Sequence, residues 1–331
     1  NFTVQNSDLI LSIGSRLSVP QVGYNFPLFA RAAKKIIVDI DSAELNKPSL
    51  KPDLPIQADA REFMVELLAQ LKNAQPFEIS DWLKRCQGWK LKYPVVLPEY
   101  KECKDAVNSF YFIGTLSEKL DKNAVIVTDM GTSFTCTMQT FKTKLGQRLS
   151  TSSGHASMGF GLPGAIGACI GNNRKDTICI SGDGGLQMNI QELQTIVHYN
   201  LPIKLFVLNN NGYLTIKATQ QNHFGRFVGA EQSSGVTCPD IIKVATAYGL
   251  QNVRIANTEE LNLKIDSVLQ AQGPIVCEIM MEENQPLIPR VSSLKKPDGT
   301  IISKPIEDLY PFLSREEFKE NMIIDPTEIL K

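Results

Sequence analysis

The sequence predicts an α/β protein built around a doubly wound parallel sheet. Short, almost continuous apolar runs recur along the second half of the chain, as is typical of parallel strands covered on both faces. Segments with helical spacing of apolar residues lie between these runs, an alternation that produces right-handed βαβ crossovers. The predicted strands are 124–128, 177–181, 203–208 and 274–279. The predicted helices are 107–120, 161–170, 187–199, 240–248 and 259–270.

The same pattern divides the 331 residues into four segments. Residues 1–73 form a small α/β unit that looks incomplete, since its few strands rarely make a stable sheet alone. Residues 74–105 lack a clear period, contain several prolines and are expected to be a linker with a short helix. Residues 106–290 form the main α/β domain. Residues 291–331 form a C-terminal tail whose apolar content predicts packing on the domain or on a partner subunit.

Composition excludes several functional classes. The net charge of −1 and the pI near 6.4 give no general attraction to nucleic acid or to an anionic membrane. No apolar stretch reaches the roughly 18 residues of a membrane span, and the N-terminus lacks a signal-peptide pattern. The seven cysteines contain no C-x-x-C pair, and several lie inside apolar runs. Reduced, buried thiols and a cytoplasmic location are therefore expected.

A glycine-rich motif with one carboxylate follows the predicted strand 177–181. It reads Gly182-Asp183-Gly184-Gly185. Ligands of open parallel sheets bind at the carboxyl ends of strands, where glycines let backbone N–H groups approach an anion. A carboxylate in such a motif would repel a phosphate unless a divalent cation lay between them. Magnesium fits this arrangement, because it takes few protein oxygens and completes its shell with phosphate and water.

The next predicted strand, 203–208, ends in Asn209-Asn210-Asn211-Gly212-Tyr213. Asp183 and Asn210 are 27 residues apart (210 − 183), the span of one helix and one strand, so the two strand ends can be neighbours. The Asp183 carboxylate, the Asn210 amide oxygen and the Gly212 carbonyl are the candidate metal ligands. Each motif alone is compatible with a plain turn, but their conjunction after two buried strands predicts a magnesium–diphosphate site.

These motifs resemble those of thiamine-diphosphate-dependent enzymes. The segment 182–193 with Asn200-Leu201-Pro202, and the segment 157–167, are similar to the acetolactate synthase and pyruvate decarboxylase group. Ile216, Gln220 and the tail 289–322 look most like acetolactate-synthase-like proteins of polysaccharide pathways. The resemblance implies the thiamine-diphosphate-binding fold for residues 106–290. It implies the second half of a Rossmann-like central domain for residues 1–73.

Thiamine diphosphate and Mg²⁺ are the cofactors that the resemblance implies, with metal ligands at Asp183, Asn210 and Gly212. Residues 131–133 match a loop that contacts the diphosphate, although a plain turn is the alternative for Ser133. Met158 matches the apolar residue that props the cofactor in its bent conformation. The expected cofactor-binding residues are Gly131, Thr132, Ser133, Ala156, Met158, Gly182, Asp183, Gly184, Gly185, Asn210, Gly212 and Tyr213.

No catalytic residue is assigned within the chain. In the family, the glutamate that activates the cofactor lies in an N-terminal pyrimidine-binding domain outside this sequence, and Glu192 does not replace it. His155 is a candidate for substrate contact, with a structural role as the alternative. A helix-end role is preferred for His198, and the role of His223 is open. We therefore expect the chain to need that domain and a second subunit, in a homodimer or tetramer, and to be inactive alone.

The resemblance implies a carboligase, a transferase or lyase that decarboxylates a 2-oxo acid such as pyruvate. It then transfers the two-carbon unit to an acceptor carbonyl. The alternatives are a thiamine-dependent decarboxylase or oxidase, and a non-catalytic cofactor-binding subunit.

Binding of FAD by the intact protein is left open. Residues 14–16 and 39–41 fall where flavin contacts of acetolactate synthases would be, whereas 17–26 depart from the synthase pattern.

Overall fold

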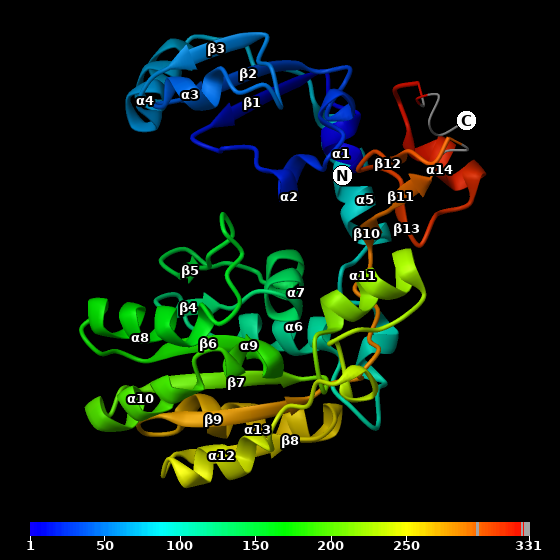
Figure 1. Ribbon diagram of the computed structural model, residues 1–331. Helices are drawn as coiled ribbons and strands as arrows, with labels where there is room; N and C mark the ends of the chain where they lie inside the picture. The colour runs from blue at the N-terminus through cyan, green and yellow to red at the C-terminus, as the bar shows by residue number, and fades with distance from the viewer. Residues whose placement is uncertain (296–297, 326, 328–331) are drawn as a thin grey trace. The chain divides into compact units, whose positions relative to one another are not determined.

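The computed structural model describes residues 1–295, 298–325 and 327, which fold into two compact units (Figure 1). Unit 1 consists of residues 1–93 and the described part of 288–331, and unit 2 consists of Pro94–Leu287. The chain therefore starts unit 1, completes unit 2 and then returns to unit 1. No described helix has the length and apolar character needed to span a membrane.

Unit 2 is built on a six-stranded, fully parallel sheet in the order β5-β4-β6-β7-β9-β8. Its strands are β4 (Val125–Thr128), β5 (Arg148–Ser150), β6 (Thr177–Gly182), β7 (Ile203–Asn209), β8 (Gln251–Ile255) and β9 (Ile275–Met280). The α/β class and the parallel sheet predicted from the sequence are confirmed. Two edge strands, β5 and β8, were not predicted, because most of their side chains are not buried and they lack a continuous apolar run.

Helices cover both faces of this sheet. They are α6 (Ser109–Lys119), α7 (Thr132–Thr140), α8 (Gly161–Gly171), α9 (Asp183–Gln187), α10 (Leu193–Tyr199), α12 (Ile241–Ala247) and α13 (Thr258–Gln270). The exception is α11 (Leu214–Phe224), which follows β7 and has no residue in either apolar cluster of the core. Successive strand residues alternate between two apolar clusters: Ile178 and Ile180 face the cluster that includes α6, α7 and α13, and Cys179 faces the one that includes α8, α10 and α12. The side-chain alternation of a strand thus produces the doubly wound core.

The segment predicted as one helix over 187–199 is interrupted. Helix α9 begins earlier, at Asp183, and a 3-10 turn (Ile190–Glu192) separates it from α10. At the break, Asn189 has a φ of −140°, outside the helical region, and its side chain donates a hydrogen bond to the Gly159 carbonyl. The tertiary contact overrides the helical periodicity of the sequence.

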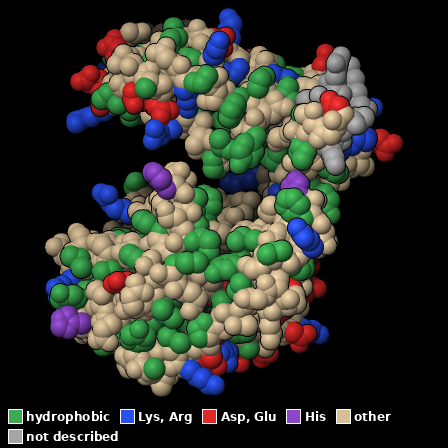
Figure 2. Space-filling model, viewed as in Figure 1, with side chains coloured by type: hydrophobic (Ala, Val, Ile, Leu, Met, Phe, Trp, Pro, Cys, Tyr) green, Lys and Arg blue, Asp and Glu red, His purple; other side chains and the backbone are tan. Residues whose placement is uncertain are grey.

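Unit 1 contains a three-stranded parallel sheet, β1 (Leu9–Ile13), β2 (Lys34–Asp39) and β3 (Leu54–Gln57). Its helices are α1 (Phe2–Gln5), α2 (Val19–Val22), α3 (Ser42–Leu45), α4 (Ala60–Leu71), α5 (Ser80–Lys92) and α14 (Arg315–Asn321). Helix α5 lies in unit 1, whereas its residues were expected to form a short helix in a linker. Helix α4 buries no residue completely, and its Met64, Val65 and Leu68 side chains are exposed. Figure 2 shows apolar side chains on the surface of the molecule.

The C-terminal tail packs into unit 1. Short strands pair as β10 (Arg290–Val291) with β13 (Leu309–Tyr310) and β11 (Ser293–Lys295) with β12 (Ile301–Ser303). Ile306 lies in the same apolar cluster as Val22 and Ile37. Residues 296–297, 326 and 328–331 of the predicted tail segment 291–331 lie outside the described residues.

A buried polar network fastens the tail to the start of the chain. The Glu307 side chain, which is fully buried, accepts a hydrogen bond from Gln5 Nε2 at 2.6 Å and pairs with Arg31 Nη1 at 2.6 Å. Gln5 Oε1 in turn accepts from the Ala30 backbone N–H at 2.6 Å. Removing the carboxylate would leave a largely buried guanidinium without its partner, which is more costly than losing a surface ion pair.

We predict that Glu307→Ala lowers the free energy of unfolding of unit 1 by roughly 2–4 kcal/mol. Urea unfolding followed by tryptophan fluorescence measures it, since Trp82 and Trp89 both lie in unit 1. As the control, Arg16→Ala removes an ion pair whose arginine side chain is 76% exposed, and should leave the unfolding midpoint close to that of the wild type. Equal unfolding midpoints for the two variants would contradict the prediction.

Candidate functional site

The site lies where β4, β6 and β7 end at the same edge of the unit 2 sheet. These strands are neighbours, and their parallel register pairs Thr128 with Ile180 and Gly182 with Leu208. From β4 the chain proceeds to β5 on one side, and from β6 it proceeds to β7 on the other, so the strand order reverses between β4 and β6. Such a reversal is where open α/β sheets place their ligands.

The structure brings the three candidate metal ligands together. The Gly212 backbone N–H donates to Asp183 Oδ2 at 2.9 Å, which joins the ends of β6 and β7. Asn210 Nδ2 donates to the Gly212 carbonyl at 3.3 Å. The Asp183 carboxylate, the Asn210 amide and the Gly212 peptide group therefore lie close together, with the Asn210 amide nitrogen facing the Gly212 carbonyl. The oxygen atoms of these three groups are of the type that Mg²⁺ prefers.

Asp183 is a buried anion at this edge. Its side chain accepts the Gly184 N–H at 2.9 Å and is 1% exposed, and no ion pair with a described Lys, Arg or His residue neutralises it. Burial raises the pKa of the carboxyl group to about 6, although the N–H groups of Gly212 and Gly184 oppose the shift. A divalent cation would reverse this effect, because it favours the charged form.

Among the described residues, no group of three or more His, Cys, Asp or Glu side chains could hold a metal ion. A metal at this edge would therefore depend on amide and carbonyl oxygens beside Asp183. This is the ligand type proposed from the sequence.

Hydrogen bonds of Asn209 connect the turn after β7 to the neighbouring strand β9. Asn209 Oδ1 accepts the Asn211 N–H at 3.0 Å, while Asn209 Nδ2 donates to the buried Glu278 of β9 at 2.7 Å. Tyr213 packs its ring directly on Gly184, where a Cβ atom would overlap the ring. These contacts fix the Asn210–Tyr213 segment against the glycine-rich turn.

The loop after β4 supplies the third strand end. Gly131 has a φ of +77° and directly precedes α7. Ser133 is fully buried and its hydroxyl donates to the Met130 carbonyl at 2.9 Å, as in the plain-turn alternative for this residue. Thr132 and the first N–H groups of α7 remain the groups of this loop best suited to an anion.

Ala156 and Met158 lie on an exposed loop. Met158 is 39% exposed, and Ala156 adopts a φ of +55°, which is unusual for a residue other than glycine. His155 is exposed on the same loop. His198 lies in the last turn of α10, before the start of β7, and His223 in the last turn of α11.

Sequence reasoning missed two residues that contact this edge. Asp129, directly after β4, is 1% exposed and accepts hydrogen bonds from Ser181 and Gly159. Its position after the predicted strand 124–128 was a usable signal, of the kind that identified Asp183. Cys238 contacts Asp183, and burial together with the charge of that residue raises the pKa of its thiol to about 12. Nothing in the sequence around Cys238 indicated this contact.

The residues considered for flavin binding are engaged in local contacts. Asp39 accepts the Asp41 N–H at 3.0 Å, Asp41 caps α3 through the Ala43 N–H at 2.8 Å, and Arg16 pairs with Glu44. These contacts lend no support to FAD binding.

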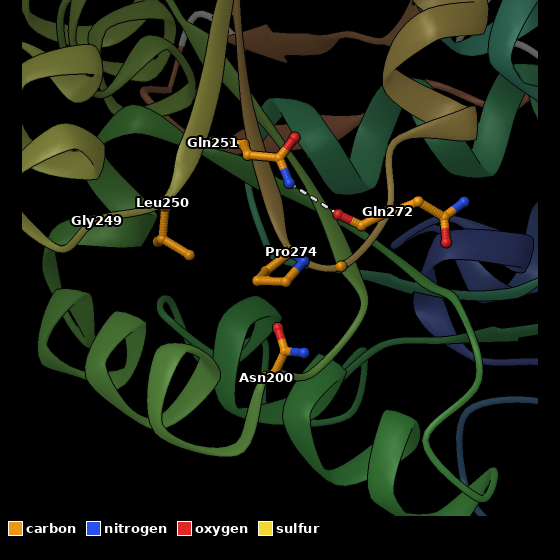
Figure 3. A pocket seen from close by; sticks show the side chains of 7 residues that line it. Asn200, Gly249, Leu250, Gln251, Gln272 and Pro274 are labelled. Carbon is orange, nitrogen blue, oxygen red and sulfur yellow. Dashed lines mark hydrogen bonds between the residues drawn. The ribbon is translucent and has the colours of Figure 1, made fainter.

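A hollow at the opposite, amino edge of the sheet is shown in Figure 3. It is lined by Asn200, Gly249, Leu250, Gln251, Gln272, Gly273 and Pro274, none of which is charged. Asn200, Gln251 and Pro274 precede or begin β7, β8 and β9, so this hollow is remote from the strand ends that carry Asp183.

Comparisons with known proteins agree with this geometry. The family model for the C-terminal TPP binding domain of thiamine pyrophosphate enzymes matches residues 129–279, and the model for the central domain matches residues 1–67. The first match spans all three strand ends of the site.

Curated relatives include acetolactate synthase large subunits. The chain is 33% identical to that of Cyanidium caldarium over 88% of its own length, and 34% identical to that of Pyropia yezoensis over 92%. It is 32% identical over 97% of its length to a probable acetolactate synthase large subunit of Methanocaldococcus jannaschii. The chain spans 49%, 51% and 53% of these proteins, respectively, about half of each. On the strength of these matches and of the parallel-sheet fold, the chain belongs to the thiamine pyrophosphate enzymes.

Proposed function

We propose that this chain binds a magnesium ion and the diphosphate of thiamine diphosphate at the carboxyl ends of β4, β6 and β7. The observation that carries the proposal is the buried Asp183 carboxylate, which lacks a cationic partner among the described residues. It accepts the Gly212 N–H, and Asn210 in turn donates a hydrogen bond to the Gly212 carbonyl. Asp183, Asn210 and the Gly212 carbonyl would hold the metal. Backbone N–H groups of the glycine-rich turn and of the start of α7 would hold phosphate oxygens.

We further propose that the intact protein is a carboligase. It would decarboxylate a pyruvate-like 2-oxo acid and transfer the two-carbon unit to an acceptor carbonyl, as the relatives named acetolactate synthase suggest. Bound thiamine diphosphate would supply the carbon nucleophile and the electron sink for this chemistry. The residues of this chain would hold the diphosphate and, through Met158 and the Ala156 backbone, orient the ring end.

Activity would require parts beyond this chain. We propose an N-terminal pyrimidine-binding domain that carries the activating glutamate, and a second subunit in a homodimer or tetramer. The relatives are about twice as long as the matched region, which is consistent with this requirement. The seven free cysteines favour a reducing, cytoplasmic setting.

The metal assignment predicts that Asp183→Ala weakens binding of thiamine diphosphate in the presence of Mg²⁺ by at least about tenfold. Removal of the carboxylate deletes the charged ligand, and isothermal titration calorimetry measures the affinity. The matched control is Asp121→Ala, an exposed carboxylate before β4 in the same unit, which should bind like the wild type. Equal affinity of Asp183→Ala and wild type would refute the metal assignment.

The activity assignment predicts no multiple turnover of pyruvate by this chain alone with Mg²⁺ and thiamine diphosphate. The intact protein, in contrast, should form a carbon–carbon bond between the two-carbon unit and an acceptor carbonyl. Product analysis by NMR separates this outcome from release of an aldehyde, expected of a decarboxylase, or of an oxidised acid, expected of an oxidase.

Without metal, the stability of unit 2 should depend on the protonation of Asp183. Because burial raises the folded-state pKa from 3.8 to about 6, the folded state holds this proton more tightly than the unfolded state. The contribution to stability is therefore present at low pH and is lost as the pH rises towards and through 6. Between pH 5 and 7 the wild type should lose about 1 kcal/mol that Asp183→Asn does not lose.

Urea unfolding of both proteins in EDTA, followed by far-ultraviolet circular dichroism at the two pH values, measures this difference. Identical pH dependence in wild type and variant would show that Asp183 does not titrate in this range.

A further inference from the structure

Asp129 is a buried carboxylate that has no part in the proposed metal site. Its Oδ1 atom accepts the N–H groups of Met130 at 2.7 Å and Gly159 at 3.0 Å, and its Oδ2 atom accepts the Ser181 hydroxyl at 2.9 Å. No ion pair joins it to another described residue. Gly159 and Ser181 are 30 and 52 residues away from Asp129 in the sequence. Their two segments and the loop after β4 therefore meet on this one side chain.

The peptide groups of Gly159 are held from two sides. Asp129 accepts the Gly159 N–H, and Asn189 Nδ2 donates to the Gly159 carbonyl at 2.9 Å. A Cβ atom on Gly159 would lie 2.6 Å from the Met188 Cβ atom, so the loop approaches the turn after α9 at backbone distance. We call Asp129, Gly159 and Asn189 the Gly159 clamp.

Within the loop, the clamped residue Gly159 comes directly after the exposed residues 155–158. Met158 is adjacent to Gly159, and Ala156 holds its left-handed backbone conformation three residues before it. Such a conformation costs free energy in an alanine and persists only where surrounding contacts impose it. The Ala156 N–H donates to the Ser152 carbonyl at 2.7 Å, and the clamp fixes the chain three residues later, at Gly159. Helix α9, which precedes Asn189, begins at Asp183.

We propose that Asp129 and Asn189 are positioning residues that hold the loop 155–159 so that Met158 and the Ala156 backbone face the ring end of the cofactor. The inference rests on the proposed function, because it assigns the ring end of the same ligand whose diphosphate end is assigned to Asp183. It predicts that loss of the Asn189 contact impairs recognition of the ring end and spares recognition of the diphosphate.

The role of Asp129 is that of an acceptor and not of a charge. Both backbone donors bind the same oxygen, Oδ1, and the Ser181 hydroxyl can rotate to accept a hydrogen bond instead of donating one. An asparagine can therefore keep all three contacts, whereas an alanine keeps none. Asp129→Asn should behave like the wild type and Asp129→Ala should not.

The test compares calorimetric affinities for thiamine diphosphate and inorganic pyrophosphate, both with Mg²⁺. Asn189→Ala should weaken thiamine diphosphate binding by about tenfold and change pyrophosphate binding by less than about twofold. Asp129→Ala should weaken both, because it also loses the contacts to Met130 and Ser181, which precede the diphosphate turns. Ser117→Ala, which removes another buried hydrogen bond at 2.8 Å within unit 2, is the matched control and should change neither affinity by more than about twofold.

The result that overturns the proposal is an equal loss for both ligands in Asn189→Ala, or an Asp129→Asn variant as weak as Asp129→Ala. Absence of Mg²⁺-dependent binding of either ligand by the wild type would instead refute the proposed function.

Hydrogen exchange tests without any ligand whether the clamp holds the loop. The variant used is Asn189→Ala, so the test does not depend on whether Asp129→Ala folds. Peptides that cover residues 151–160 should exchange about tenfold faster in Asn189→Ala than in the wild type and in Ser117→Ala, with α13 unchanged. Unchanged exchange in that segment would show that Asn189 does not hold the loop, and would overturn the proposal.

Discussion

The hydrogen bond from the Gly212 N–H to the buried Asp183 carboxylate is the contact on which the site depends. It joins the ends of two adjacent parallel strands and opposes the rise in pKa that burial imposes on the carboxyl group. The Asp183 carboxylate is buried, has no cationic partner among the described residues and has a raised pKa. A buried carboxyl group with a raised pKa is consistent with a site that a ligand completes.

The doubly wound core makes this arrangement rigid. β6 and β7 are buried along almost their whole length, so the residues that follow them start from fixed positions. Glu278 on β9 then extends the support outward through Asn209 to the Asn210–Tyr213 turn. A third strand end, after β4, contributes Asp129 and the start of α7. Rigid strands thus position short loops, as in open α/β sheets generally.

The sequence predicted the elements that have a strong one-dimensional signature. The four central strands are continuous apolar runs, and the glycine and asparagine motifs follow two of them directly. The edge strands β5 and β8 were missed because their pairing partner, and not their own composition, makes them strands. The break in the helix at Asn189 and the contact of Cys238 with Asp183 depend on residues far away in the sequence. The spacing of apolar residues along the sequence does not indicate such contacts. The packing of the tail on unit 1 could not be predicted from local sequence either. Ile306 and Glu307 contact residues near the N-terminus, far away in the sequence.

The discontinuity of unit 1 has a consequence for synthesis on the ribosome. Gln5 and Glu307 are 302 positions apart, yet they share one buried hydrogen bond. Unit 2 is continuous in the chain and can assemble as soon as it has emerged. Unit 1 has to wait for nearly the last described residues, so its apolar surface stays incomplete throughout most of translation. Nascent chains stalled before residue 306 would therefore carry an unfinished first unit beside a finished second one, and chaperones that recognise exposed apolar segments would act mainly on the former.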